Sequence, residues 1–326
     1  DPQFIKNLAQ DLLLNNQHRV RLVMKPDCNL GRLTEQQEKD RLARIQKDLD
    51  SEDKQQIIDE AVALKKRQEM EEDLDILPKV GIEDIPADIF YAEPKASRAS
   101  PIAMTSYSAG TNGLVYQQVV MPMPHFTPEQ MDLLPLYSTC ATEMGVGHRD
   151  YLATQLWHSS VVGSYSASAN VRSDKDCLEK LHGNISFSAK GLASNQAAMT
   201  DLMQQSIEHT RFDELPRLRE LVAQIRSYRE SSIVGNGHIM AMHAAASGLS
   251  ASAYLTQRWG GLSGLSLIKA LDTSLNNEQE LEKLASQLQE IHTKVLQQPR
   301  QHLLIAEQER LDVFETQIQS NFKTHA

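Results

Sequence analysis

The chain has 326 residues, of which 40% are hydrophobic, enough for at least one full core and, at about 150 residues per domain, for about two units. Its 33 basic and 43 acidic residues give a net charge of −10, and the scattered Lys and Arg argue against a nucleic-acid partner. No apolar run reaches the roughly 18 residues that a membrane span needs. The three cysteines are far apart and in no C-x-x-C pair, so they encode neither a disulfide framework nor a cysteine zinc site: Cys28, Cys140 and Cys177.

The first 27 residues predict a helix followed by a strand. Phe4, Leu8 and Leu12 recur on one side of a helix over residues 3–15, and residues 20, 22 and 24 alternate as in a short strand. The opening DPQFI reads as the interior of a longer protein, so we expect residues 1–27 to be the end of a preceding domain. The lack of a leader therefore carries no information about the compartment.

Residues 28–75 predict a charged helical hairpin. Glu, Lys, Gln and Arg dominate from Thr34 to about Asp73, and the sparse apolar positions fall at helical spacing. Two amphipathic helices joined near Ser51 explain this pattern, and the charge run suits a solvated helix face with i,i+4 pairs. Residues 76–101, which hold four prolines and no periodicity, predict an extended connector and a domain boundary.

From residue 102 to 326 strand and helix patterns alternate. The runs 102–109 and 114–121, separated by a Gly-Thr-Asn-Gly turn, predict an antiparallel hairpin. Thr127, Pro128 and Gln130 predict a capped helix start, and the helix should run to Gly145. Alternating residues at 161–171 and 185–189 predict two strands with one polar face.

The rest of this segment is mainly helical. We expect helices over 194–207, from 213 or 214 to as far as 246, over 250–258, in 261–271, over 281–295 and over 311–318, with a short strand at 302–306. The predicted fold class is α+β, an antiparallel sheet with helices packed on one face.

The histidines do not form a zinc signature. A helical zinc hydrolase site needs two His one turn apart with a Glu that activates the metal-bound water, and neither H-E-x-x-H nor H-x-x-E-H occurs among the 11 histidines. His238 and His243 are five residues apart and diverge by roughly 140° on a helix. Gly235 and Gly237 offer a break there, but packing or capping is the favoured interpretation.

Four other groups could be interpreted chemically, but a structural interpretation is favoured for each. Glu143, His148, Arg149 and Asp150 lie at a helix end, where capping and local hydrogen bonds are usual. His158 precedes Ser159 and Ser160 but lacks a G-x-S-x-G elbow. The glycine-rich run 260–264 lacks the P-loop lysine and the dinucleotide spacing, so it reads as a turn between helices. Four methionines at helical spacing suit core filling and only weakly suggest a peptide-binding wall: Met199, Met203, Met240 and Met242.

Several stretches in order resemble the presequence-protease branch of the insulinase/pitrilysin zinc metallopeptidases. They are His18-Arg19-Val20 to Lys25-Pro26-Asp27 with the charged hairpin, Ile82-Glu83-Asp84-Ile85-Pro86 leading to Thr111-Asn112-Gly113-Leu114-Val115-Tyr116, and Gly235-Asn236-Gly237-His238 followed by Trp259-Gly260-Gly261-Leu262-Ser263 and Leu267-Ile268-Lys269-Ala270-Leu271. The resemblance covers nearly the whole chain.

The resemblance implies a four-domain enzyme whose two halves, joined by the hairpin, close around an unfolded peptide. It places the zinc ligands and the general-base Glu in the first domain, on an H-x-x-E-H helix that this chain lacks, so no catalytic, cofactor-binding or metal residue is carried over. The expected function is a non-catalytic part of a peptide-degrading zinc metalloendopeptidase, comprising the linker and a third, inactive domain that forms a wall of the chamber. The expected partners are the parent's other domains and unfolded peptides, without nucleic acid or membrane, in a bacterial cytoplasm or an organelle matrix. The alternative is a stand-alone scaffold subunit that kept the fold without catalysis. An enzyme with an unrecognised site is the third possibility.

Overall fold

A computed structural model of the chain describes residues 3–71, 76–86, 88, 91–97 and 102–322. The chain divides into two compact units, residues 1–89 and residues 90–326. None of the helices in the described ranges combines the length and the apolar character that crossing a bilayer requires.

The first unit consists of helices and extended segments. Helix α1 (Phe4–Ala9) continues into a π turn (Gln10–Leu14), and the predicted pair of charged helices is present as α2 (Leu30–Asp48) and α3 (Ser51–Gln68). The side chain of Asp50 caps α3, because it accepts a hydrogen bond from the Asp53 amide. A 3₁₀ turn, η3, spans Ile82–Asp84. No described residue of this unit is buried.

The strand predicted at residues 18–24 is wrong. These residues form no ladder in the described structure, and Val20 and Met24 remain 94% and 86% exposed. A strand is stable only when a neighbour satisfies its backbone groups, and no described segment of the first unit offers one.

The second unit is built on a six-stranded sheet. Its strands are β1 (Lys95–Ser97), β2 (Ala103–Ser108), β3 (Leu114–Pro122), β4 (Ser164–Ser173), β5 (Leu181–Leu192) and β6 (Gln301–Ala306). The order is β1-β2-β6-β3-β5-β4, and every neighbouring pair is antiparallel except β2 with β6. The sheet is therefore mixed, which corrects the prediction of a purely antiparallel one.

The predicted pairing of residues 102–109 with residues 114–121 in a hairpin is also wrong. Both strands exist, and Asn112 and Gly113 adopt the positive φ angles of 51° and 77° that Asn-Gly turns favour. However, β6 lies between β2 and β3 and pairs with both. The turn reverses the chain over the end of β6, where the Ala109 amide donates to the Ala306 carbonyl at 3.0 Å.

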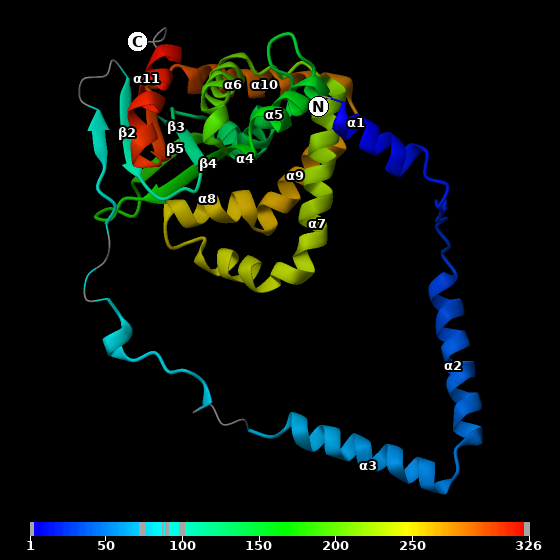
Figure 1. The fold of residues 1–326 in the computed structure, drawn as a ribbon. Helices are drawn as coiled ribbons and strands as arrows, with labels where there is room; N and C mark the ends of the chain where they lie inside the picture. Colours follow the sequence, from blue (N-terminus) through cyan, green and yellow to red (C-terminus); the bar gives the residue numbers. More distant parts are fainter. Residues whose placement is uncertain (1–2, 72–75, 87, 89–90, 98–101, 323–326) are drawn as a thin grey trace. The chain divides into compact units, whose positions relative to one another are not determined.

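Helices cover one face of this sheet, as predicted (Figure 1). They are α4 (Pro128–Glu143), α5 (Tyr151–Val161), α6 (Gln196–His209), α7 (Leu215–Ala246), α8 (Ala251–Gly260), α9 (Leu262–Ser274), α10 (Glu278–Leu296) and α11 (Leu311–Asn321). The core forms where the inward residues of β3 and β5 meet α4, α6 and α10, and Val119, Phe187 and Leu288 are fully buried there. The capping box of Thr127 and Gln130 confirms the predicted start of α4.

Candidate functional site

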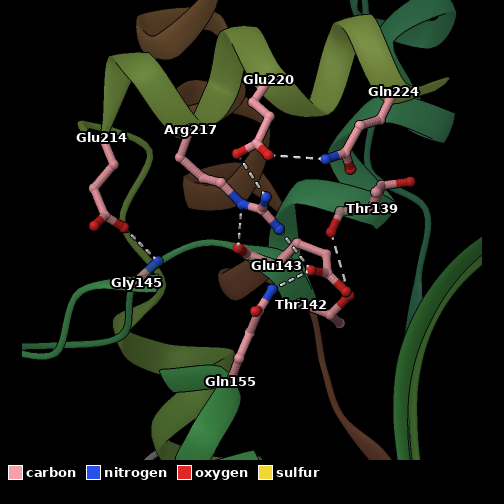
Figure 2. A network of polar contacts seen from close by, with 9 residues as sticks. All are labelled: Thr139, Thr142, Glu143, Gly145, Gln155, Glu214, Arg217, Glu220 and Gln224. Carbon is pink, nitrogen blue, oxygen red and sulfur yellow. Dashed lines mark hydrogen bonds and ion pairs between the residues drawn. The ribbon is translucent and has the colours of Figure 1, made fainter. Parts of the chain in front are cut away.

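Glu143 lies in a polar network that joins the end of α4 to α5 and α7 (Figure 2). Its Oε2 accepts from Arg217 at 2.9 Å and from the Gln155 amide at 2.6 Å. Arg217 is only 8% exposed, also pairs with Glu220 at 2.9 Å, and lies over the Tyr151 ring at 4.6 Å. The Glu143 carboxylate is thus held by the buried Arg217 guanidinium. In this structural arrangement the carboxylate serves as a hydrogen-bond acceptor.

The neighbouring candidate residues are separated by their own local contacts. The Asp150 carboxylate caps α5 by accepting from the Ala153 amide at 2.8 Å. Arg149 lies over the Trp157 ring at 4.2 Å, and His148 is exposed. Glu214 accepts from the amides of Gly145 and Tyr151 at 2.8 and 3.1 Å. These contacts agree with the interpretation as capping and local hydrogen bonding, and no acid/base pair is assembled from the four residues.

His158 is not positioned to activate the serines that follow it. Its Nε2 lies 3.0 Å from the Ser206 hydroxyl, and burial, reinforced by the Arg149 charge, lowers the pKa of His158 to about 4. Ser159 and Ser160 donate instead to the carbonyls of residues 156 and 157 of their own helix. His158 therefore has a packing role, and Ser159 and Ser160 form hydrogen bonds within their own helix.

The histidine pair of α7 remains divided. The helix departs from helical geometry at Asn236 (φ −116°, ψ 17°), but His238 and His243 both follow that break and share one regular stretch. Their spacing of five residues still directs them to different sides of the helix. Across the described residues, no group of three or more His, Cys, Asp or Glu side chains converges in a way that could hold a metal ion. Within the part of the chain that the structure describes, His238 and His243 are therefore not brought together with a third ligand for zinc.

The glycine run and the methionines have packing roles. Gly264 lies where α9 starts against α8, and a Cβ there would come within 2.6 Å of the carbonyl oxygens of Arg258 and Trp259. Met199, Met203 and Met240 are buried, whereas Met242 is 66% exposed. Of the cysteines, Cys140 is buried and the other two are exposed, and burial raises the pKa of the Cys140 thiol to about 12.

The broadest functional candidate is the face of the sheet that the helices leave uncovered, which we call the open face. The outward residues of β3 remain half-buried or exposed while the inward residues are buried. The open face is mixed on β2, β6 and β3, where Tyr, Val, Leu and Ile side chains predominate, and polar on β5 and β4. Its members include Thr105, Tyr107, Tyr116, Gln118, Val120, Ser164, Ser166, Ser168, Asn170, Arg172, His182, Asn184, Ser188, Lys190, Gln301, Leu303 and Ile305.

The open face has two depressions and little charge. One, of about 350 Å³, lies between Tyr116, Ser166 and Leu303, and the other, of about 380 Å³, is lined by Val120 and Arg172. Arg172 and Lys190 of the open face are basic, although the whole chain carries −10, and the Asp174 carboxylate just beyond β4 lies 2.7 Å from Nε2 of His182. The Gln118 amide donates to the Ser188 hydroxyl at 2.8 Å, so part of the polar surface is ordered in advance.

The profile of a family described as associated with the M16 peptidases of subfamily C matches residues 24–271, which is more than three quarters of the chain. The chain belongs to this family. The match spans the helices α2 and α3, all but one strand of the sheet, the helices α4 to α8 and most of α9. Family membership therefore covers most of both units.

Curated relatives of this family member are presequence proteases. The mitochondrial presequence protease of Xenopus laevis is 26% identical over 271 residues, covering 83% of this chain and 26% of the relative. Presequence protease 1, chloroplastic/mitochondrial, of Arabidopsis thaliana is 26% identical over 299 residues, covering 89% of this chain and 27% of the relative. The chain thus spans about a quarter of the length of the curated relatives it matches, and it corresponds to a non-catalytic segment of a presequence-protease-type peptidase.

Two solved structures give partial matches to this chain. A peptidase M16 inactive domain from Pseudomonas fluorescens matches with a TM-score of 0.44 and 12% identity, covering 71% of this chain and 50% of that chain. A conserved protein from Enterococcus faecalis matches with a TM-score of 0.47 and 9% identity, covering 72% and 52%.

Sequence reasoning found the polar half of the open face but missed the rest of the site. The alternating serines of β4 were sufficient to predict the polar half, because polar residues at every second position indicate a strand with one solvated side. The apolar half was missed because Leu303 and Ile305 reach it only through the insertion of β6. Arg217 gave no signal, since a lone Arg in a helix predicts exposure.

Proposed function

We propose that this chain is a non-catalytic part of a zinc-dependent metalloendopeptidase that degrades peptides, in which it supplies the linker between two halves and one wall of the peptide-enclosing chamber. The carrying observation is the family match over residues 24–271 together with relatives that are about four times as long and are named presequence proteases. In this proposal residues 1–27 end a preceding domain, residues 28–75 are the linker, residues 76–101 are the connector and residues 102–326 are the inactive domain.

The open face is the surface that we assign to the wall. An unfolded peptide of varied sequence offers backbone amides, carbonyls and occasional apolar side chains. Ser, Asn and Gln side chains can exchange hydrogen bonds with such a backbone, and the half-buried Val120, Leu303 and Ile305 can take up apolar groups. The fixed charges of this face are few, since Arg172 and Lys190 are basic and the Asp174 carboxylate lies beside His182. Most contacts to a peptide would therefore come from uncharged groups, which discriminate little between acidic and basic peptides.

In this proposal the zinc-bound chemistry belongs to residues outside this chain, because the described residues do not fit a metal site. The chain would contribute enclosure, which excludes water from the reacting peptide. We propose the same compartment as for the named relatives, an organelle matrix, or a bacterial cytoplasm.

A reconstitution experiment tests the proposed function. The purified chain is assayed alone for zinc content and peptide cleavage, and then mixed with the upstream polypeptide of its parent gene. We expect no stoichiometric zinc and no cleavage alone, and chelator-sensitive cleavage in the mixture. Stoichiometric zinc with cleavage by the chain alone would refute the non-catalytic assignment. A parent gene without an upstream H-x-x-E-H segment would favour the stand-alone scaffold.

A cross-linking experiment tests the wall. In the parent protein, with its general-base Glu replaced and Cys28 and Cys177 changed to Ser, a photoreactive maleimide is attached to a cysteine introduced by Ser166→Cys. A matched control carries Gln289→Cys on the exposed side of α10. We expect cross-links to bound peptide from position 166 and only background from position 289. Equal yields from the two positions would contradict the assignment of the open face.

A further inference from the structure

A separate pocket of about 340 Å³ opens between four helices of the second unit: α4, α7, α8 and α9. Its walls are almost entirely apolar, and they include Leu133 and Pro135 of α4, Ile225 of α7, Trp259 of α8 and Leu267 and Leu271 of α9. This volume lies in the range of small-ligand sites, which are usually apolar with a few fixed polar groups. The open face contributes none of the residues that line it.

The charges around this pocket cancel, with one exception. The Arg258 guanidinium forms a two-pronged ion pair with Asp132, whose first contact is 2.6 Å. Two further ion pairs join α7 to α9: Arg226 pairs with Asp272 at 2.7 Å, and Glu230 pairs with Lys269 at 2.9 Å. Each of these three pairs joins one cation to one anion, so together they leave no net charge for a ligand to meet.

Arg229 is the exception. It lines the pocket and is half-buried, and within the described residues its guanidinium has no ion pair or hydrogen bond. Burial lowers the pKa of Arg229, because no acid compensates for the lost water. A partly desolvated guanidinium without a partner is costly, and its planar fork matches a carboxylate.

We propose that this pocket is a binding site for an apolar carboxylate, whose hydrocarbon part fills the space between α4 and α9 and whose carboxylate pairs with Arg229. Two sources carry this chemistry: a medium-chain fatty acid and the free carboxy terminus of a peptide that ends in an apolar residue. The site requires both halves of the ligand. An alkane lacks the partner for Arg229, and a small anion such as acetate leaves the apolar walls uncovered.

Titration calorimetry on the 326-residue chain tests the proposal with paired probes. Decanoate is compared with decanol, and the peptide Gly-Gly-Leu-Phe with a free carboxy terminus is compared with its carboxy-terminal amide. We expect saturable binding, with a Kd below about 1 mM, for at least one carboxylate, and binding at least about tenfold weaker for its uncharged counterpart. Which carboxylate binds more tightly identifies the source.

Variants locate the site. Arg229→Gln should weaken the bound carboxylate at least about tenfold, and Arg229→Lys should retain part of the affinity. Arg310→Gln, which removes the same charge from an exposed arginine outside the pocket, is the matched control and should bind as the unaltered chain does. Ala270→Phe adds an aromatic ring at the pocket wall and should abolish binding of either source with Arg229 intact.

Two results would overturn the proposal. One is that neither carboxylate binds with a Kd below about 1 mM. The other is that binding persists unchanged in both Arg229→Gln and Ala270→Phe while circular dichroism shows that both variants are folded. Tryptophan fluorescence provides an independent readout, because Trp259 lines the pocket and Trp157→Phe leaves it as the single tryptophan of the chain.

Discussion

Arg217 is the residue through which the structural interpretation of the Glu143 network can be tested. In Arg217→Met the apolar stem is kept and the guanidinium is removed. The bond to Glu143 joins a buried cation to a carboxylate that is 40% exposed, and the bond to Glu220 joins it to one that is 49% exposed. A hydrogen bond to a charged group contributes about 1.5–3 kcal/mol when desolvated. An exposed i,i+3 pair contributes at most about 0.5 kcal/mol.

The expected loss in Arg217→Met is therefore about 2–3 kcal/mol, most of it from the Glu143 side. Urea denaturation followed by near-ultraviolet circular dichroism measures this loss as a shift of the midpoint. Glu220→Gln should cost about 0.5 kcal/mol or less. A double-mutant cycle of Arg217→Met with Glu143→Gln should give a coupling of about 1–2 kcal/mol. Equal costs for the two glutamate variants, or strictly additive effects in the cycle, would refute this reasoning.

Three further predictions concern buried groups. Burial lowers the pKa of His302 to about 4, and neither of its ring nitrogens has a partner in the described structure. The unfolded chain, with a His pKa near 6.5, binds more protons between these values, so the stability present above pH 6.5 should fall by about 3 kcal/mol as the pH drops through 4. His302→Leu should make that part of the pH profile of the denaturation midpoint less steep without flattening it, because burial also lowers the pKa values of His158 and His292 to about 4. An unchanged slope would contradict the cause. Gly264→Ala should lower the free energy of unfolding by about 1–3 kcal/mol, because the added Cβ meets backbone carbonyls. Gly260→Ala, whose Cβ meets nothing closer than 4.0 Å, is the control, and equal melting temperatures for the two variants would be evidence against the close approach. In a thiol titration with a colorimetric disulfide reagent, two cysteines should react at once and Cys140 only after denaturant is added. Three rapid reactions in the native protein would show that Cys140 is accessible.

The elements that are determined by residues close together in the sequence could be predicted. The capping box at Thr127, the helices α2 and α3, and the positive φ angles at Asn112 and Gly113 follow from local chemistry. Helix α5 was missed although its cap was visible. Capping was the favoured interpretation of the cluster that contains Asp150, but no helix was predicted after it, where its side chain is the N-cap of α5.

The strand order could not be predicted, because it depends on a long-range competition. Residues 102–121 contain everything that a hairpin needs, and β6 displaces that pairing from about 180 residues further along the chain. Insertion lets the buried Leu304 and Ala306 join the core while their neighbours complete the open face. No local pattern encodes this choice, because both arrangements satisfy the same alternation.

The contrast between the two units bears on the proposed role of the first one. Helices α2 and α3 have 19 and 18 residues, and in proteins most of the stability of a helix comes from packing of its amphipathic face rather than from its intrinsic propensity. Their apolar positions Leu42, Ile45 and Ile57 are 43–52% exposed, and none of the described residues of this unit is buried. Capping at Asp50 and the i,i+4 ion pairs contribute only a few tenths of a kcal/mol to about 1 kcal/mol each. A segment with amphipathic helices and no core of its own gains most of its stability from a surface that its apolar stripe can cover. That requirement fits a linker, since a linker packs on domains that other parts of a longer protein supply.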